Sequence, residues 1–119
     1  MMTPAEIAEN IVKALDDKKG KDIKLLKTGG LTVLADYFVI CTATSSPHMK
    51  ALSDEADKRL TELGEPPLRR EGYRSGSWLL MDFGAVILHL FDEEARKFYN
   101  LERLWTDAED IDISQIVAE

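Results

Sequence analysis

Cys41, His48 and His89 are the residues from which a nucleophilic catalytic pair could be built in this sequence. Such a pair needs a thiol beside an imidazole that accepts its proton. Cys41 ends the apolar run Tyr37–Cys41, which is typical of a buried strand, so we expect it to be a small hydrophobic part of the core. One thiol and two histidines also lack a recognisable zinc-binding spacing. We expect His48, beside Pro47, to be a solvated first-turn residue, and His89 to make a contact or hydrogen bond rather than to bind a metal.

Carboxylates could instead support nucleotidyl transfer, which needs acidic side chains that converge on a divalent metal beside a loop that holds phosphates. Thr44–Ser45 follows the apolar run and could imitate such a loop. Asp82 stands alone on its predicted strand, however, and Asp92–Glu94 lies where acids would cap the next helix. Asp110 and Asp112 lie near the C-terminus. The sequence therefore predicts no cofactor and no metal, and a degenerate or unrecognised nucleotide-binding enzyme remains the alternative interpretation.

The elements that would position these side chains begin with a helix and two strands. Thr3 can cap a helix that has Pro4 at its first position and Glu6 reaching back to the cap. Asp22–Lys27 predicts a short strand. Tyr37–Cys41, a continuous apolar run, predicts a central strand that is buried on both faces.

A second helix and a third strand follow. Ser46 can cap this helix, Pro47 can begin it, and Gly64–Pro67 ends it. Apolar residues repeat along it at helical spacing: Met49, Leu52, Ala56, Leu60 and Leu63. Leu68–Tyr73 then predicts a strand. A strand, a helix and a strand in this order favour a right-handed parallel crossover, and the whole pattern predicts a single α/β domain with helices packed on a mixed sheet.

The stretch 77–105 predicts a β-hairpin followed by a helical segment. Trp78–Phe83 and Ala85–Phe91 flank Gly84, and their side chains alternate between two faces. One face is uniformly apolar and belongs in the core: Leu79, Met81, Phe83, Val86, Leu88 and Leu90. The other face is mixed: Trp78, Asp82, Ile87, His89 and Phe91. Such a mixed face suits a protein partner, although a helix of the same chain could equally cover it.

Several motifs occur in one unbroken order: A-D-Y-F-V-I-C-T-A-T-S, E-G-Y, W-x-x-x-D-F-G, V-I-L-H-L-F and E-E-A-R-x-F-Y-N-L-E-R-L-W. In this order they resemble the ribosomal silencing factor family, also called the Iojap family, from about Ile7 to Trp105. The chain differs from the usual family pattern at Ala85, where relatives usually carry an acidic residue, and at Ala43, where they usually carry glycine. It also continues past Trp105, where short relatives end.

The resemblance implies a nucleotidyltransferase-like α/β fold. It also implies a binding function: relatives bind the large ribosomal subunit at ribosomal protein L-fourteen, on the face that meets the small subunit. They thereby prevent subunit joining and silence translation when nutrients are short. Family members often form homodimers.

Composition and charge restrict the class of protein. The chain has 119 residues with a formal net charge of −7 and a single cysteine, which indicates one domain without an internal disulfide. The sequence has neither an apolar run long enough to cross a bilayer nor a signal peptide, so we expect a cytosolic protein with no membrane partner. Its negative charge disfavours binding in a nucleic-acid groove and favours a basic protein partner.

The candidate binding surface combines the mixed hairpin face with the acidic and aromatic residues that follow it: Trp78, Asp82, His89, Asp92, Glu93, Tyr99 and Leu101. We expect Leu104 and Trp105 to pack in the core instead. We divide the chain into a family domain, residues 1–105, and an acidic C-terminal tail, residues 106–119. The tail carries acids but no Lys or Arg, and its apolar residues could dock a short helix: Ile111, Ile113, Ile116 and Val117.

Overall fold

The computed structural model describes residues 2–31, 35–73 and 77–117. Its centre is a mixed six-stranded sheet with the order β3-β4-β5-β2-β1-β6. The strands are β1 (Lys21–Lys27), β2 (Tyr37–Thr42), β3 (Arg69–Glu71), β4 (Trp78–Asp82), β5 (Val86–Phe91) and β6 (Glu109–Asp110). Only the central pair β2–β5 is parallel among the described pairings. This architecture confirms the predicted α/β domain with a mixed sheet.

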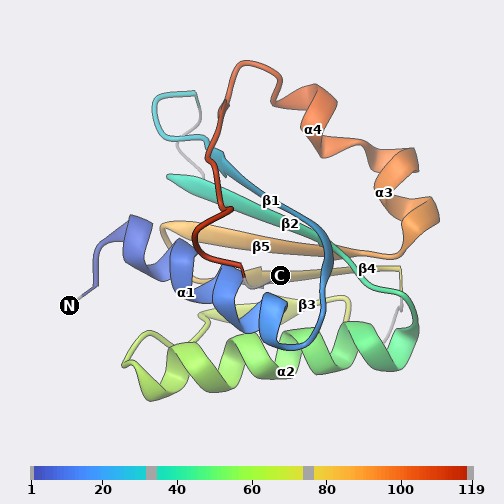
Figure 1. Ribbon diagram of the computed structural model, residues 1–119, viewed down its shortest axis with the longest axis horizontal. Coiled ribbons are helices and arrows are strands. Elements are labelled where there is room, and N and C mark those ends of the chain that lie inside the picture. The colour runs from blue at the N-terminus through green and yellow to red at the C-terminus, as the bar shows by residue number, and fades with distance from the viewer. Residues whose placement is uncertain (1, 32–34, 74–76, 118–119) are drawn as a thin grey trace.

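Helices α1 (Pro4–Asp17) and α2 (Ser46–Glu62) cover one face of the sheet (Figure 1). Thr3 and Glu6 form the predicted capping box at the start of α1. The uniformly apolar hairpin face packs under these helices with β2, and the six residues predicted for that face all have exposures of 7% or less. The main hydrophobic core therefore lies between the sheet and α1 and α2.

Helices α3 (Glu93–Tyr99) and α4 (Leu101–Leu104) lie on the opposite face, shown in orange in Figure 1. A second apolar cluster packs beneath them, formed by Leu26, Ala35, Phe38, Ile40, Phe91 and Ala95, with Leu101 and Trp105 against it. The expectation that a helix of the same chain covers the mixed face is therefore confirmed in part, and contact of this face with a protein partner stays a prediction. The α3–α4 segment covers the part of it near Phe91, while Trp78, Leu80 and Ile87 stay partly exposed.

The predicted hairpin is confirmed. Strands β4 and β5 pair antiparallel from Trp78↔Phe91 to Asp82↔Ile87. Gly84 in the turn has φ +87°, a conformation that glycine adopts without steric cost. The side chains of the hairpin were therefore assigned to the correct faces of the sheet.

Two local predictions were wrong. Ser45, rather than Ser46, caps α2, because its side chain accepts the backbone N–H of His48. His48 is half-buried rather than solvated: its Nδ1 accepts the Thr44 backbone N–H at 2.9 Å, and its Nε2 lies 2.8 Å from the Lys18 carbonyl oxygen. Leu63, at the end of α2, is 46% exposed.

The crossover from β2 through α2 joins strands that are not neighbours. Strand β3 runs parallel to β2, since one parallel and two antiparallel pairings separate them, but β5 and β4 lie between the two. The parallel direction agrees with the prediction. The sequence did not show that β5 and β4 lie between β2 and β3, because the pairing of β2 with β5 joins segments that are distant in the sequence. The narrower expectation of a nucleotidyltransferase-like fold stays a prediction.

The C-terminal segment adds a short strand, β6, to the edge of the sheet. Glu109 and Asp110 pair antiparallel with β1, and the following residues run toward α1, in red in Figure 1. The four apolar residues of the tail are partly buried against the main core, as expected: Ile111, Ile113, Ile116 and Val117. The predicted domain boundary at residue 105 stays a prediction, and Glu119 lies outside the described residues. No helix in the described parts of the chain is long and apolar enough to span a membrane.

Candidate interaction surface

Trp78, which is partly exposed, and Tyr99 form the centre of an aromatic cluster on the mixed face. Their ring centroids are 4.5 Å apart, and Trp78 also packs on Phe91 at 5.2 Å. Trp78 comes from β4 and Tyr99 from the end of α3, so two segments distant in the sequence build one surface. Tyr99 is 43% exposed. Large aromatic side chains that keep one side exposed are typical anchors of protein interfaces.

His89 lies beneath this pair and is only 5% exposed. Its Nδ1 is 3.2 Å from the indole Nε1 of Trp78, and its ring stacks on Phe91 and meets Phe38 edge-on. Burial lowers the pKa of His89 to about 4. The sequence placed His89 on the correct face, but its depth leaves almost no area for direct contact with a partner.

Asp82 and Asp92 both make hydrogen bonds within the protein. The sequence indicated this role for Asp92 but not for Asp82. The Asp82 carboxylate accepts the Gly84 backbone N–H at 2.8 Å and pairs with Arg69 at 3.2 Å. Asp92 caps α3 by accepting the Ala95 backbone N–H at 2.7 Å, as the sequence predicted. Both carboxylates therefore stabilise the frame of the surface and keep only part of their area for a partner.

The remaining predicted surface residues differ in exposure. The side chain of Glu93 is 80% exposed and lies 3.7 Å from Lys97. Leu101 is partly buried and packs inward with the cluster beneath α4. The structure thus brings Trp78, Tyr99 and His89 together, sets Glu93 in solvent on the first turn of α3, and turns Leu101 toward the core.

Sequence analysis missed two exposed apolar side chains on the same segment. Phe98 is 81% exposed, and its ring centre lies 5.1 Å from that of Tyr99. Trp78, Tyr99 and Phe98 thus form an aromatic row in this order. Leu104 was assigned to the core, but it is 73% exposed. Trp105 does pack as expected, edge-on against Phe38 at 5.4 Å. Leu104 and Trp105 are adjacent in the sequence, but Leu104 faces solvent and Trp105 faces the core. Both are large and apolar, so their residue types alone could not show which of them is buried.

Arg96 fixes the α3–α4 segment to the end of the sheet. Its guanidinium pairs with both carboxylate oxygens of Glu102 on α4, and donates to the Asp22 carbonyl oxygen at 2.6 Å and to the Thr42 hydroxyl at 2.8 Å. Its side chain is only 12% exposed. Asn100 joins the two helices in the left-handed conformation, with φ 45°, which asparagine tolerates better than most residues. The exposed aromatic row therefore stands on a rigid support.

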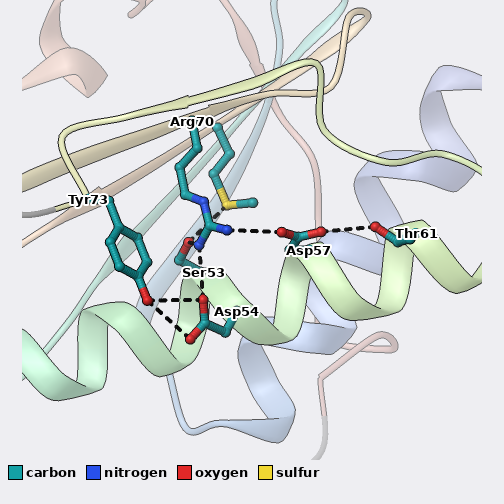
Figure 2. A network of polar contacts seen from close by, with 7 residues as sticks. Ser53, Asp54, Asp57, Thr61, Arg70 and Tyr73 are labelled. Carbon is teal, nitrogen blue, oxygen red and sulfur yellow. Dashed lines mark hydrogen bonds and ion pairs between the residues drawn. The ribbon is translucent and has the colours of Figure 1, made fainter.

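A polar network on the other side of the sheet holds the edge strand β3 against α2 (Figure 2). Arg70 donates to Ser53, Asp54 and Asp57 at 2.7 to 3.0 Å, and its guanidinium lies 4.6 Å from the ring centre of Tyr73. Asp54 in turn accepts from the Tyr73 hydroxyl at 3.3 Å.

Gly72 lies between Arg70 and Tyr73 in the sequence and packs against the backbone of Trp78 in the candidate surface. Gly72 has φ +81°, and a Cβ added there would lie 2.2 Å from the Trp78 carbonyl oxygen. A side chain at this position would therefore push the Trp78 backbone away. The glycine of the E-G-Y motif thus permits the close approach of the Trp78 backbone.

The groups considered for catalysis do not assemble into a reactive site within the described parts of the chain. Cys41 is fully buried, and burial raises the pKa of its thiol to about 12, so the predicted core role is confirmed. A hollow of about 560 Å³ lies beside α3. The Lys and Arg residues that line it, Lys24, Arg96 and Lys97, are each paired with a carboxylate. The hollow therefore offers phosphate groups little free positive charge.

Comparison with known proteins identifies the family. Residues 2–119 match the family described as ribosomal silencing factor during starvation. A ribosomal silencing factor from Halalkalibacterium halodurans is 35% identical over 98% of this chain and 100% of its own length. The mouse protein named mitochondrial assembly of ribosomal large subunit protein 1 is 34% identical over 92% of this chain and 50% of its own length.

Solved structures agree with this assignment. A crystal structure of a Chromobacterium violaceum protein matches with a TM-score of 0.86 and 37% identity, over 88% of each chain. The match therefore covers most of the chain rather than one motif. The chain therefore belongs to the ribosomal silencing factor family, whose members are named as regulators rather than as enzymes.

Proposed function

We propose that this protein represses translation by binding the large ribosomal subunit at ribosomal protein L-fourteen, where it sterically blocks association with the small subunit under nutrient limitation. Family membership supports a role in ribosome silencing. The name of the mouse relative, which refers to assembly of the ribosomal large subunit, supports the large subunit as the partner. The block itself requires only occupancy of the joining face, so no reaction and no cofactor are involved.

The observation that carries this proposal is the aromatic row formed by the partly exposed Trp78 and the exposed Tyr99 and Phe98. Their rings contact one another in sequence on a rigidly supported segment, which favours a preorganised interface. Asp92, Glu93 and Glu94 at the start of α3 add negative charge beside the row, which Lys97 partly offsets at 3.7 Å from Glu93, whereas the charge of Asp82 is paired with Arg69. That charge complements a basic ribosomal protein and would speed association at low salt.

A subunit-joining assay tests this function directly. Purified large subunits are mixed with this protein and then with small subunits, and formation of whole ribosomes is followed by light scattering. We expect joining to fall in proportion to occupancy, and isolated ribosomal protein L-fourteen added in excess to restore it. Undiminished joining with saturating protein bound to the large subunit would refute the steric block, and no effect of L-fourteen would refute the docking site.

We also propose that the protein acts in the cytoplasm, where free subunits are available, and that it forms a homodimer. The same aromatic row is the surface that a second copy would cover, so dimer and ribosome complex would compete. Light scattering over a dilution series should show a mass that falls from two chains to one. A strictly monomeric protein at high concentration would reject the dimer.

A further inference from the structure

We infer that His89 is a positioning residue, whose imidazole holds the Trp78 indole in its binding orientation from beneath the surface. This inference rests on the proposed function only for its consequence, ribosome binding. The orientation itself is a property of the free protein and can be measured there.

The hydrogen-bond geometry fixes the state of the imidazole. An indole N–H can only donate, so the His89 Nδ1, 3.2 Å from the Trp78 Nε1, must accept. Nδ1 therefore carries no proton, and in the neutral ring the proton lies on Nε2. Stacking on Phe91 at 6.1 Å and an edge contact with Phe38 at 5.0 Å hold the ring plane.

The choice of histidine carries a cost that packing alone does not explain. His89 Nε2 is buried and has no hydrogen-bond partner among the described residues. A buried, unsatisfied donor destabilises a fold, and a phenylalanine, although somewhat larger, would suit the aromatic neighbours without leaving such a donor. What a phenylalanine cannot supply is an acceptor for the Trp78 indole. The imidazole thus favours orientation of Trp78 over stability.

Trp78 needs such a constraint because it lies at the open edge of the cluster. It is partly exposed, whereas His89 and Phe91 beneath it are buried. Its ring contacts Phe91 and Tyr99, but apolar ring contacts alone permit a flipped indole. A directional hydrogen bond distinguishes the two orientations.

The first experiment uses the unaltered protein labelled with ¹⁵N. We expect a scalar coupling across the hydrogen bond between Trp78 Nε1 and His89 Nδ1, and ¹⁵N shifts that show an unprotonated Nδ1 and a protonated Nε2. Protonation at Nδ1, or absence of the coupling together with rapid exchange of the indole proton, would overturn the inference. Neither result depends on ribosome binding.

The second experiment compares variants in large-subunit binding. His89→Phe should keep or raise the melting temperature, broaden the Trp78 indole resonance and weaken binding about three- to tenfold, as expected for ordering one side chain on binding. His89→Asn keeps an acceptor at the position of Nδ1 and should restore the indole resonance. Ile40→Val is the matched control, because Ile40 pairs with His89 on the adjacent strand and belongs to the same cluster.

The outcomes separate the two claims. A His89→Phe protein that is destabilised but retains an ordered indole and full affinity would show a merely structural role. If the unaltered protein fails to bind large subunits although the coupling is present, the proposed function fails and the positioning of Trp78 stands.

Discussion

At the scale of single residues, the side chains of the candidate surface differ in their exposure to solvent. In the proposed function, Trp78 and Tyr99 would present area to a partner, while His89 and Asp82 would act through the Trp78 indole and the Gly84 backbone that they hold. A substitution at any of the four could weaken binding, but for different physical reasons. Affinity alone therefore cannot assign their roles, and stability and side-chain order must be measured with it.

Burial of His89 makes the stability of the protein sensitive to mild acid. Burial lowers the pKa of His89 to about 4, whereas the unfolded chain has the ordinary value of about 6.5. Between these values the unfolded chain binds a proton that the folded protein does not. The corresponding stability is therefore present above about pH 6.5 and is lost as the pH falls toward 4. From about pH 7 to about pH 5 we expect a loss of about 2 kcal/mol in the free energy of unfolding.

Urea denaturation at both pH values measures this loss, and His89→Phe provides the comparison. The variant should lose less stability over the same interval, since it has no buried imidazole to protonate. Equal losses in the two proteins would show that His89 does not titrate as its burial predicts.

At the scale of elements, Arg96 determines whether α3 and α4 form a rigid platform. Arg96→Met removes the contacts with Glu102, Asp22 and Thr42 while keeping much of the side-chain volume. We expect a loss of about 2 kcal/mol in the free energy of unfolding and faster amide hydrogen exchange in α3 and α4 than in the central strands. The exposed neighbour Lys97 gives the control Lys97→Met, which should change neither quantity appreciably. Similar effects of the two substitutions would argue against the Arg96 clamp.

The C-terminal segment should contribute more to stability than to binding. Its apolar residues pack against the main core, and β6 pairs with β1 at the edge of the sheet opposite β3, whereas Trp78 lies on β4. Removal of the chain after Trp105 should cost about 3 kcal/mol, from the lost burial of partly covered Ile and Val side chains, yet leave large-subunit binding measurable at low temperature. A folded truncated protein that no longer binds would show that the tail creates the site.

Local signals made the first helix and the hairpin predictable. The capping box of Thr3 and Glu6 and the alternation around Gly84 act over a few residues, and both were recovered from sequence. Strand β6 was not predictable, because two acidic residues pair there with β1, which is more than 80 positions away, as the Lys24–Asp110 ion pair also shows. Long-range pairing, not local propensity, determines the sheet edge.

The sequence predicted which side of the sheet the candidate surface residues occupy, but it did not predict how exposed each of them is. Alternation placed Trp78, Asp82 and His89 on one side of the hairpin. Their exposure depends on where α3 and α4 lie, which Arg96 fixes through partners distant in the sequence. For this reason His89 was assigned a direct contact that its burial does not allow, and Leu104 was assigned to the core.

At the scale of the whole molecule, the two faces of the sheet carry different structures. The α1 and α2 face holds the main core, and the Arg70 network fixes β3 on that side. The opposite face supports the aromatic row. Phe98 and Tyr99 are exposed, whereas Trp78 also packs on Phe91 and donates to His89. Its removal should therefore cost some stability, but it should leave the main core between the sheet and α1 and α2 intact. Binding and folding can therefore be tested separately.

The most direct test is co-sedimentation of the double variant Trp78→Ala, Tyr99→Ala with purified large ribosomal subunits. Asp82 stays unchanged, because replacing it would also disturb the hairpin turn and Arg69. Leu63→Ala, at an exposed leucine on the end of α2, is the matched control. We expect the double variant to keep a cooperative melting transition and to lose binding by at least about thirtyfold, as for an interface anchor worth about 2 kcal/mol or more, while Leu63→Ala binds like the unaltered protein. A folded double variant that co-sediments as well as the unaltered protein would contradict the assignment of this surface.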